Sequence, residues 1–84
     1  MSNERIKELM AQLHSELESA QVDEETLNLA RSLDVDIQRV IEEGEENENL
    51  LDQARDAEAR FAAEHPVAEK LVREVIDILG KIGI

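Results

Sequence analysis

The chain has 84 residues, 42% hydrophobic and 36% charged, so we expect one small domain over residues 1–84 rather than a disordered chain. Its 21 acidic and nine basic side chains give a net charge of -12, which disfavours direct binding to nucleic acid because phosphate neutralisation requires a basic surface. It has no cysteine, no apolar run near the roughly 18 residues of a membrane span, and no basic leader, so we expect a cytoplasmic protein without disulfides, cysteine-based metal sites or membrane contact.

The first predicted helix covers residues 3–20. Ser2 or Asn3 can cap it, since a short polar side chain accepts a hydrogen bond from a free amide of the first turn. Its apolar positions advance by alternating steps of four and three residues, the spacing of a coiled-coil seam. They are Ile6, Met10, Leu13, Leu17 and Ala20. The pattern predicts an amphipathic helix that buries one narrow face.

A second helix is predicted over residues 24–43. Asp23 is placed to cap it, and Val22 can contact Leu27 across the first turn as a hydrophobic staple. Gly44 stands where a left-handed residue ends a helix. The apolar stripe consists of Ala30, Leu33, Ile37, Val40 and Ile41. Val35 points away from this stripe, so it is either exposed on its own or part of a contact.

The third predicted helix covers residues 48–64, and small side chains dominate its seam. The seam consists of Leu50, Leu51, Ala54, Ala57 and Phe61, the last being the only aromatic residue. A neighbouring backbone is therefore expected to approach this helix closely. Pro66 disfavours helical geometry at His65 but suits a first helical position. We predict a break at His65, and one continuous kinked helix is the alternative.

The fourth predicted helix covers residues 66–82 and has the widest apolar arc, about half of its circumference. The first helix covers about a quarter to a third, enough to pack on one neighbour, whereas a bundle of this size has few elements to cover the wider arc. We therefore expect a second copy to cover it, with Val72 and Ile76 at the outer edge. The candidate self-association residues are Val67, Leu71, Val72, Val75, Ile76 and Leu79.

Two further patterns mark the end and the polar side of this helix. Gly83 is predicted as the left-handed residue that ends it, with Ile84 packing on Leu79, and Gly80 is the alternative. Charges of alternating sign at four-residue spacing are typical of a solvent-exposed face. They belong to Glu69, Arg73, Asp77 and Lys81.

The segment EEGEENEN at residues 42–49 joins the second and third helices. It lacks the alternating oxygen ligands and the closing glutamate of a helix–loop–helix calcium site. We expect a hydrated connection, and the alternative is an acidic patch that attracts divalent ions weakly or a basic partner. Residues 1–48 carry fourteen acidic and four basic side chains, net -10, while residues 49–84 carry seven and five, net -2. Electrostatic repulsion between copies is therefore expected mainly from the first half.

No residue pattern typical of catalysis or cofactor binding is found. A carboxylate-bridged di-metal bundle needs Glu three residues before His on two helices, and Ala11 and Ala62 occupy those positions. His14 has Glu18 one turn away and is interpreted as a flank histidine paired with a carboxylate, and His65 as a helix-start residue. The hydroxyl residues lack a strand-to-helix elbow, and the three glycines form no phosphate loop. We predict that the protein is not an enzyme and uses no metal or cofactor.

Two stretches together resemble a known family: IKELMAQLHSELESAQVDEETLNLARSLDVDIQR at residues 6–39 and ARFAAEHPVAEKLVREVIDILGKIGI at residues 59–84. The leucine–histidine helix, the DEE start, the DIQ ending, the ARF and AEHP joint and the terminal LGKIGI are similar to domain-of-unknown-function family 4404. EEGEENEN is the least characteristic part. The resemblance implies a small bacterial, cytosolic protein and carries no activity or site residue.

These patterns predict an all-α protein in which two helical hairpins fold as a small antiparallel bundle or complete one across a dimer. The first functional hypothesis is a non-enzymatic helical interaction module that self-associates as a homodimer. The alternative is an acidic mimic that sequesters a basic, nucleic-acid-binding protein.

Overall fold

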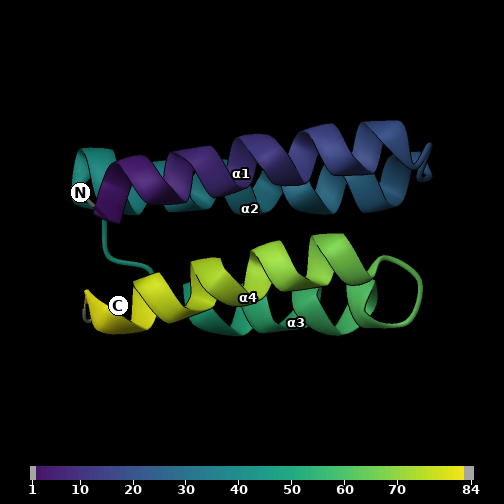
Figure 1. Cartoon of the computed structure of the whole chain (residues 1–84). Helices are drawn as coiled ribbons and strands as arrows, with labels where there is room; N and C mark the ends of the chain where they lie inside the picture. Colours follow the sequence, from purple (N-terminus) through teal and green to yellow (C-terminus); the bar gives the residue numbers. More distant parts are fainter. Residues whose placement is uncertain (1, 83–84) are drawn as a thin grey trace.

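The computed structural model of the chain describes residues 2–82 and contains four α-helices and no strand within this range (Figure 1). The helices are α1 (Ser2–Ser19), α2 (Glu24–Glu43), α3 (Leu50–Ala62) and α4 (Pro66–Lys81). The predicted all-α class is confirmed. The third helix is shorter at both ends than the predicted range of 48–64.

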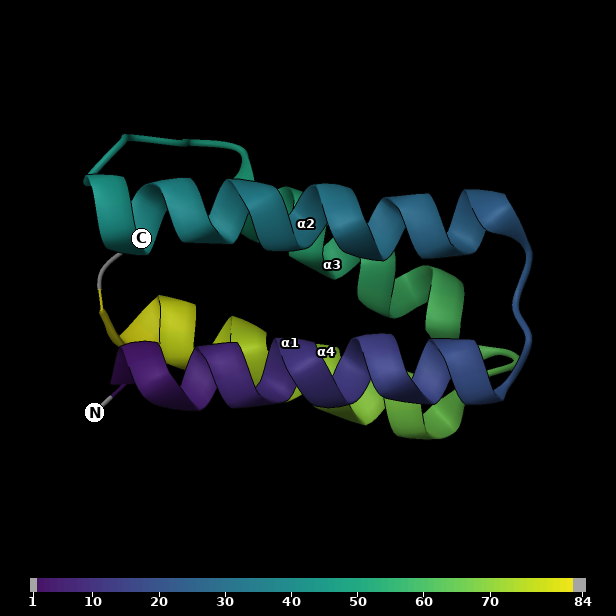
Figure 2. The same ribbon diagram turned by 90° about the horizontal axis from the view of Figure 1, so that it is seen from above.

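Consecutive helices run antiparallel, so the chain forms two hairpins, α1–α2 and α3–α4, that lie on one another (Figures 1 and 2). α1 packs on α4 and α2 packs on α3, whereas the helices of each diagonal pair do not approach one another closely. The most extensive contact joins α3 and α4, as expected from the small side chains of Ala54 and Ala57 on the buried side of α3. This arrangement is the small antiparallel bundle that the sequence predicts.

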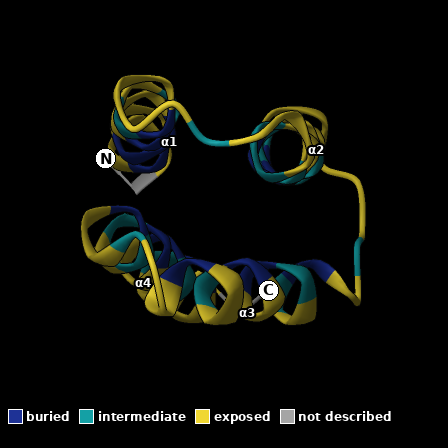
Figure 3. Ribbon diagram, turned by 90° about the vertical axis from the view of Figure 1, so that its right-hand side faces the viewer, coloured by how far each residue is buried: buried dark blue, intermediate teal, exposed yellow. Residues whose placement is uncertain are grey.

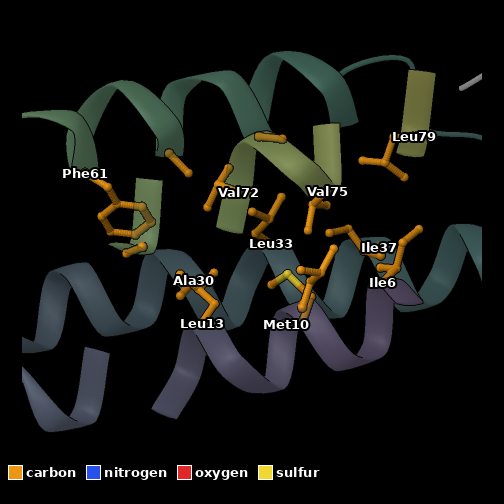
Figure 4. Packing of buried hydrophobic residues seen from close by; sticks show 14 of the residues in the cluster. Ile6, Met10, Leu13, Ala30, Leu33, Ile37, Phe61, Val72, Val75 and Leu79 are labelled. Carbon is orange, nitrogen blue, oxygen red and sulfur yellow. The ribbon is translucent and has the colours of Figure 1, made fainter. Parts of the chain in front are cut away.

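The core lies between the hairpins and consists of apolar side chains (Figures 3 and 4). Each helix contributes its inward side, and no polar or charged side chain is buried in the part of the chain that the structure describes. The buried residues are Ile6, Leu9, Met10, Leu13, Leu17, Ala30, Leu33, Ile37, Leu50, Ala54, Ala57, Phe61, Ala68, Val72, Val75 and Leu79. Each large aliphatic side chain buried here contributes about 1.5–3 kcal/mol of transfer free energy.

The core face of α1 differs from the predicted seam at two positions. Leu9 is fully buried although the strict four-and-three spacing omits it, and Ala20 is exposed because α1 ends at Ser19. α1 contacts both α2 and α4, so its buried face is wider than a seam that meets one neighbour. Asn3, one of the two predicted caps, lies inside α1, and the side chain of Ser2, the other, lies outside the described part of the structure.

Local signals set the ends of α2 as predicted. Asp23 Oδ1 accepts a hydrogen bond from the Thr26 amide at 2.9 Å, and the Thr26 side chain and backbone hold the pKa of Asp23 below its usual value. Gly44 is left-handed, with φ of 71°, and its amide donates to the Arg39 carbonyl. Both ends of the helix therefore have their free backbone groups partly satisfied.

The predicted break at His65 is confirmed, so the kinked continuous helix is excluded. His65 has φ of -133° and ψ of 71°, and α4 begins at Pro66. The predicted cap by Gly83 and Ile84 lies outside the described residues, whereas Gly80, the alternative, lies within α4.

The turn between α1 and α2 is a Schellman motif, which the sequence pattern does not predict. The Val22 amide donates to the Leu17 carbonyl at 3.4 Å, and the Gln21 amide to the Glu18 carbonyl at 3.2 Å. These bonds place Gln21 at the left-handed position, with φ of 55°, where glycine is usual.

Candidate interaction surface

The structure corrects half of the predicted self-association surface on α4. Val72, Val75 and Leu79 are buried in the core of the single chain, so they are not available to a second copy. Val72 was expected at the outer edge of the apolar arc, and this placement is wrong. α4 packs against both α1 and α3, so two helices of the same chain cover part of the arc that the prediction left to a second copy.

A row of apolar side chains remains at the edge of α4 beside α1, next to its buried side. Glu74 marks this edge, because its Oε2 accepts a hydrogen bond from Arg5 Nη2 on α1 at 2.9 Å. Positions seven before, three before, four after and eight after Glu74 share its side of the helix. We call them the outer seam of α4: Val67, Leu71, Ile78 and Ile82.

The outer seam is only partly covered by the bundle. Val67 is 52% exposed and Ile82 is 41% exposed, while Leu71 and Ile78 are half-buried against the core. Val67 and Leu71 belong to the predicted surface, but Ile78 and Ile82 do not. Their spacing from Val67 groups them on one side of the helix, but the buried residues Ala68, Val72, Val75 and Leu79 repeat the same steps, so spacing alone does not show which row is exposed.

Ile76, another residue of the predicted surface, lies on the opposite side of α4. It is half-buried three residues after Arg73, whose Nε donates to Glu58 Oε2 on α3 at 3.2 Å. This side is therefore closed by α3, and the outer seam does not include Ile76.

The alternating charges on α4 pair differently from the predicted single row. Arg73 binds Glu69 one turn earlier and Glu58 of α3, so it joins α3 to α4. The pKa of Glu58 is lowered, first by a hydrogen bond with the Glu69 side chain and then by Arg73, and both carboxylates raise the pKa of Arg73. Asp77 does not take part in this network.

α4 is electrically neutral, whereas each of the other three helices has an excess of acidic side chains. Its acidic residues are Glu69, Glu74 and Asp77, and its basic residues are Lys70, Arg73 and Lys81. Lys70 and Asp77 are exposed and form no ion pair with any residue of the described range 2–82. Two outward charges of opposite sign thus stand two turns apart beside the outer seam.

His14 pairs with Asp34 rather than with Glu18. Its Nε2 lies 3.3 Å from Asp34 Oδ2, and both side chains are partly buried between α1 and α2. The predicted type of partner, a carboxylate, is correct, but the carboxylate comes from the neighbouring helix instead of the same one. Lys7 and Glu42 form a second ion pair between α1 and α2.

The acidic linker, residues 44–49 between α2 and α3, is irregular except for a turn just before α3, and its glutamates are exposed. Asn47 Oδ1 accepts a hydrogen bond from the Asn49 amide at 3.0 Å, and the Asn47 carbonyl accepts one from Leu50. The side chains of Glu45, Glu46 and Glu48 are exposed. Within residues 2–82, no group of three His, Cys, Asp or Glu side chains is arranged to hold a metal ion.

A shallow cavity of about 200 Å³ lies between α2 and the end of α3. It combines apolar side chains with charged ones of both signs. The rings of Phe61 and His65 pack edge to face, with their centroids 6.2 Å apart. Its lining consists of Glu25, Thr26, Leu29, Arg60, Phe61, Glu64 and His65.

None of the described helices is long and apolar enough to cross a lipid bilayer.

The fold and this surface define the class: a small antiparallel four-helix bundle with an apolar core and an exposed apolar seam on its last helix. The chain belongs to the family described as domain of unknown function DUF4404, which matches residues 6–84. The resemblance noted in the sequence is thereby confirmed. No curated protein and no solved structure matches the chain.

Proposed function

We propose that the chain is a non-enzymatic interaction module of the cytoplasm that associates with a second copy of itself through the outer seam of α4. The observation that carries this proposal is the coincidence of exposed apolar side chains with local neutrality. Val67 and Ile82 are two of the three large hydrophobic side chains exposed in the described part of the chain; Val67 lies on the neutral helix and Ile82 directly follows its last residue.

The physical chemistry favours this side of the molecule for association. Two copies with a net charge of -12 repel each other, and the repulsion is least where the local charge is zero. Val67 and Ile82 lose contact with water when a second seam covers them, which contributes to binding in proportion to the buried apolar area. A patch that meets its own copy about a two-fold axis forms a closed dimer.

The test compares the unmodified chain with two single variants, Val67→Glu and Val35→Glu. The two valines are 52% and 50% exposed, so each substitution adds the same charge at a similarly accessible site, one in the seam and one on α2. Sedimentation velocity at micromolar concentration is expected to give a dimer for the unmodified chain and for Val35→Glu, and a monomer for Val67→Glu. Far-ultraviolet circular dichroism checks that both variants keep their helices.

Two results would contradict the proposal. One is a monomer for the unmodified chain. The other is a dimer that responds equally to both substitutions, which would remove the seam from the interface.

A second candidate function, an acidic mimic that binds a basic protein, is favoured by the linker. Glu45, Glu46 and Glu48 are exposed and form no ion pair in the range that the structure covers. Binding through these charges would weaken steeply with salt. Replacing all three by Gln should then weaken capture of a basic polypeptide such as polylysine at low salt while leaving the helices intact. Capture of unchanged strength would contradict the mimic.

A further inference from the structure

We propose that the α4 helices of the two copies pair antiparallel, with the two-fold axis crossing at the level of Arg73 and Glu74, so that Lys70 of each copy lies opposite Asp77 of the other. This inference rests on the proposed self-association and specifies the geometry of the contact. It follows from the unpaired charges beside the outer seam and from the spacing of the seam itself.

The charges select the orientation. Lys70 and Asp77 are seven residues apart, so they stand on the same side of α4 two turns apart, and both are exposed without an ion-pair partner among residues 2–82. A parallel pair of helices would place Lys70 beside Lys70 and Asp77 beside Asp77. An antiparallel pair centred between Arg73 and Glu74 instead forms the Lys70–Asp77 pair twice. Like charges are thereby replaced by opposite charges.

The apolar side chains fit the same register. With the axis at this level, Val67 stands opposite position 80 of the second copy, between Ile78 and Ile82 on the outer seam. A side chain held between two residues four positions apart is the packing found in coiled coils. The two most exposed residues of the seam, Val67 and Ile82, therefore cover one another in both halves of the contact.

The centre of the contact tolerates a carboxylate. Glu74 lies near the two-fold axis, where it would approach its own copy, but each Glu74 is bound by Arg5 of the same chain at 2.9 Å. The guanidinium offsets the charge that the second copy would otherwise meet. The register thus leaves no unpaired charge of like sign at the axis.

Charge reversal tests the orientation. Lys70→Asp and Asp77→Lys each turn two attractions into two repulsions, so each is expected to weaken the dimer roughly tenfold at low salt. The double variant restores opposite charges in an antiparallel pair, and its dimerisation constant should return to within about threefold of the unmodified value. Single variants that leave the constant unchanged, or a double variant as weak as the singles, would overturn the register.

A distance measurement provides an independent readout. Because the chain has no cysteine, Lys81→Cys introduces a single position for a spin label at an exposed site. In the antiparallel register, position 81 stands opposite position 66, so the two labels lie 15 residues apart along the helix axis, a separation of roughly 20–25 Å. Parallel helices would bring them to about 10 Å.

The two tests distinguish failure of this inference from failure of the proposed function. A dimer with a label separation near 10 Å overturns the antiparallel register and leaves self-association intact. A chain that sediments as a monomer overturns both.

Discussion

Gln21 adopts a backbone conformation that costs free energy. It has φ of 55° at the left-handed position of the Schellman turn after α1, and its side chain is exposed. For a residue with a Cβ atom this conformation is unfavourable by roughly 1 kcal/mol relative to glycine. Gln21→Gly is therefore expected to stabilise the chain by about 0.5–1 kcal/mol, seen as a higher midpoint in thermal unfolding followed by circular dichroism.

A control separates the backbone effect from loss of the glutamine side chain. Gln21→Ala removes the side chain but keeps the Cβ atom, so its midpoint should stay close to that of the unmodified chain. An increase of equal size in both variants would contradict the account of the turn.

At the scale of elements, Arg73 joins α3 to α4 by binding Glu58 and Glu69. Arg73→Met removes the guanidinium and leaves two carboxylates close together, so the unfolding midpoint at pH 7 should fall by about 2–6 °C. The folded-state pKa of Glu58 is lowered, so its contribution is present above the unfolded pKa and is lost as the pH falls through the folded value.

The pH dependence supplies the check on this prediction. The difference in midpoint between the unmodified chain and Arg73→Met should shrink as the pH falls through the lowered pKa of Glu58 and this side chain becomes protonated. An NMR titration of Glu58 should show its pKa rising in the variant. A difference that stays the same after the NMR titration shows Glu58 to be protonated would mean that Arg73 acts through packing rather than charge.

Local signals explain why the helix ends were predictable. Asp23, Gly44 and Pro66 each act on backbone groups within one turn, so their effect does not depend on the rest of the fold. The left-handed conformation of Gln21 was missed because it is imposed by the turn and not by the residue's own preference. Sequence could therefore place most boundaries but not every turn type.

The exposure of the outer seam of α4 could not be predicted from the sequence of this helix. How much of an apolar arc is covered depends on how many helices pack against it, and α4 has two neighbours. Periodicity identified the apolar positions correctly but could not decide that Val72 faces the core while Val67 faces solvent. That division is a property of the tertiary arrangement.

At the scale of the whole molecule, Val72 and Val67 lie five residues apart on α4, and substitution by Glu should affect the stability of the fold at Val72 but not at Val67. Val72 is fully buried, so Val72→Glu places an unpaired carboxylate in the apolar core at a cost above about 3 kcal/mol, a large part of the stability of a small domain. Circular dichroism should show loss of helicity or a sharply lower midpoint. Val67→Glu, on the exposed seam, should remain folded. A Val72→Glu variant that keeps the helicity and the unfolding midpoint of the unmodified chain would contradict the burial of Val72 in the core.

The central claim, that two copies associate through an apolar contact on the neutral helix, is tested most directly by sedimentation equilibrium of the unmodified chain. The monomer mass is 9.5 kDa. We predict twice this mass at micromolar concentration, both at low salt and at about 1 M salt, because screening weakens the repulsion between acidic copies and leaves apolar burial in place. A mass of one chain under both conditions would contradict the account.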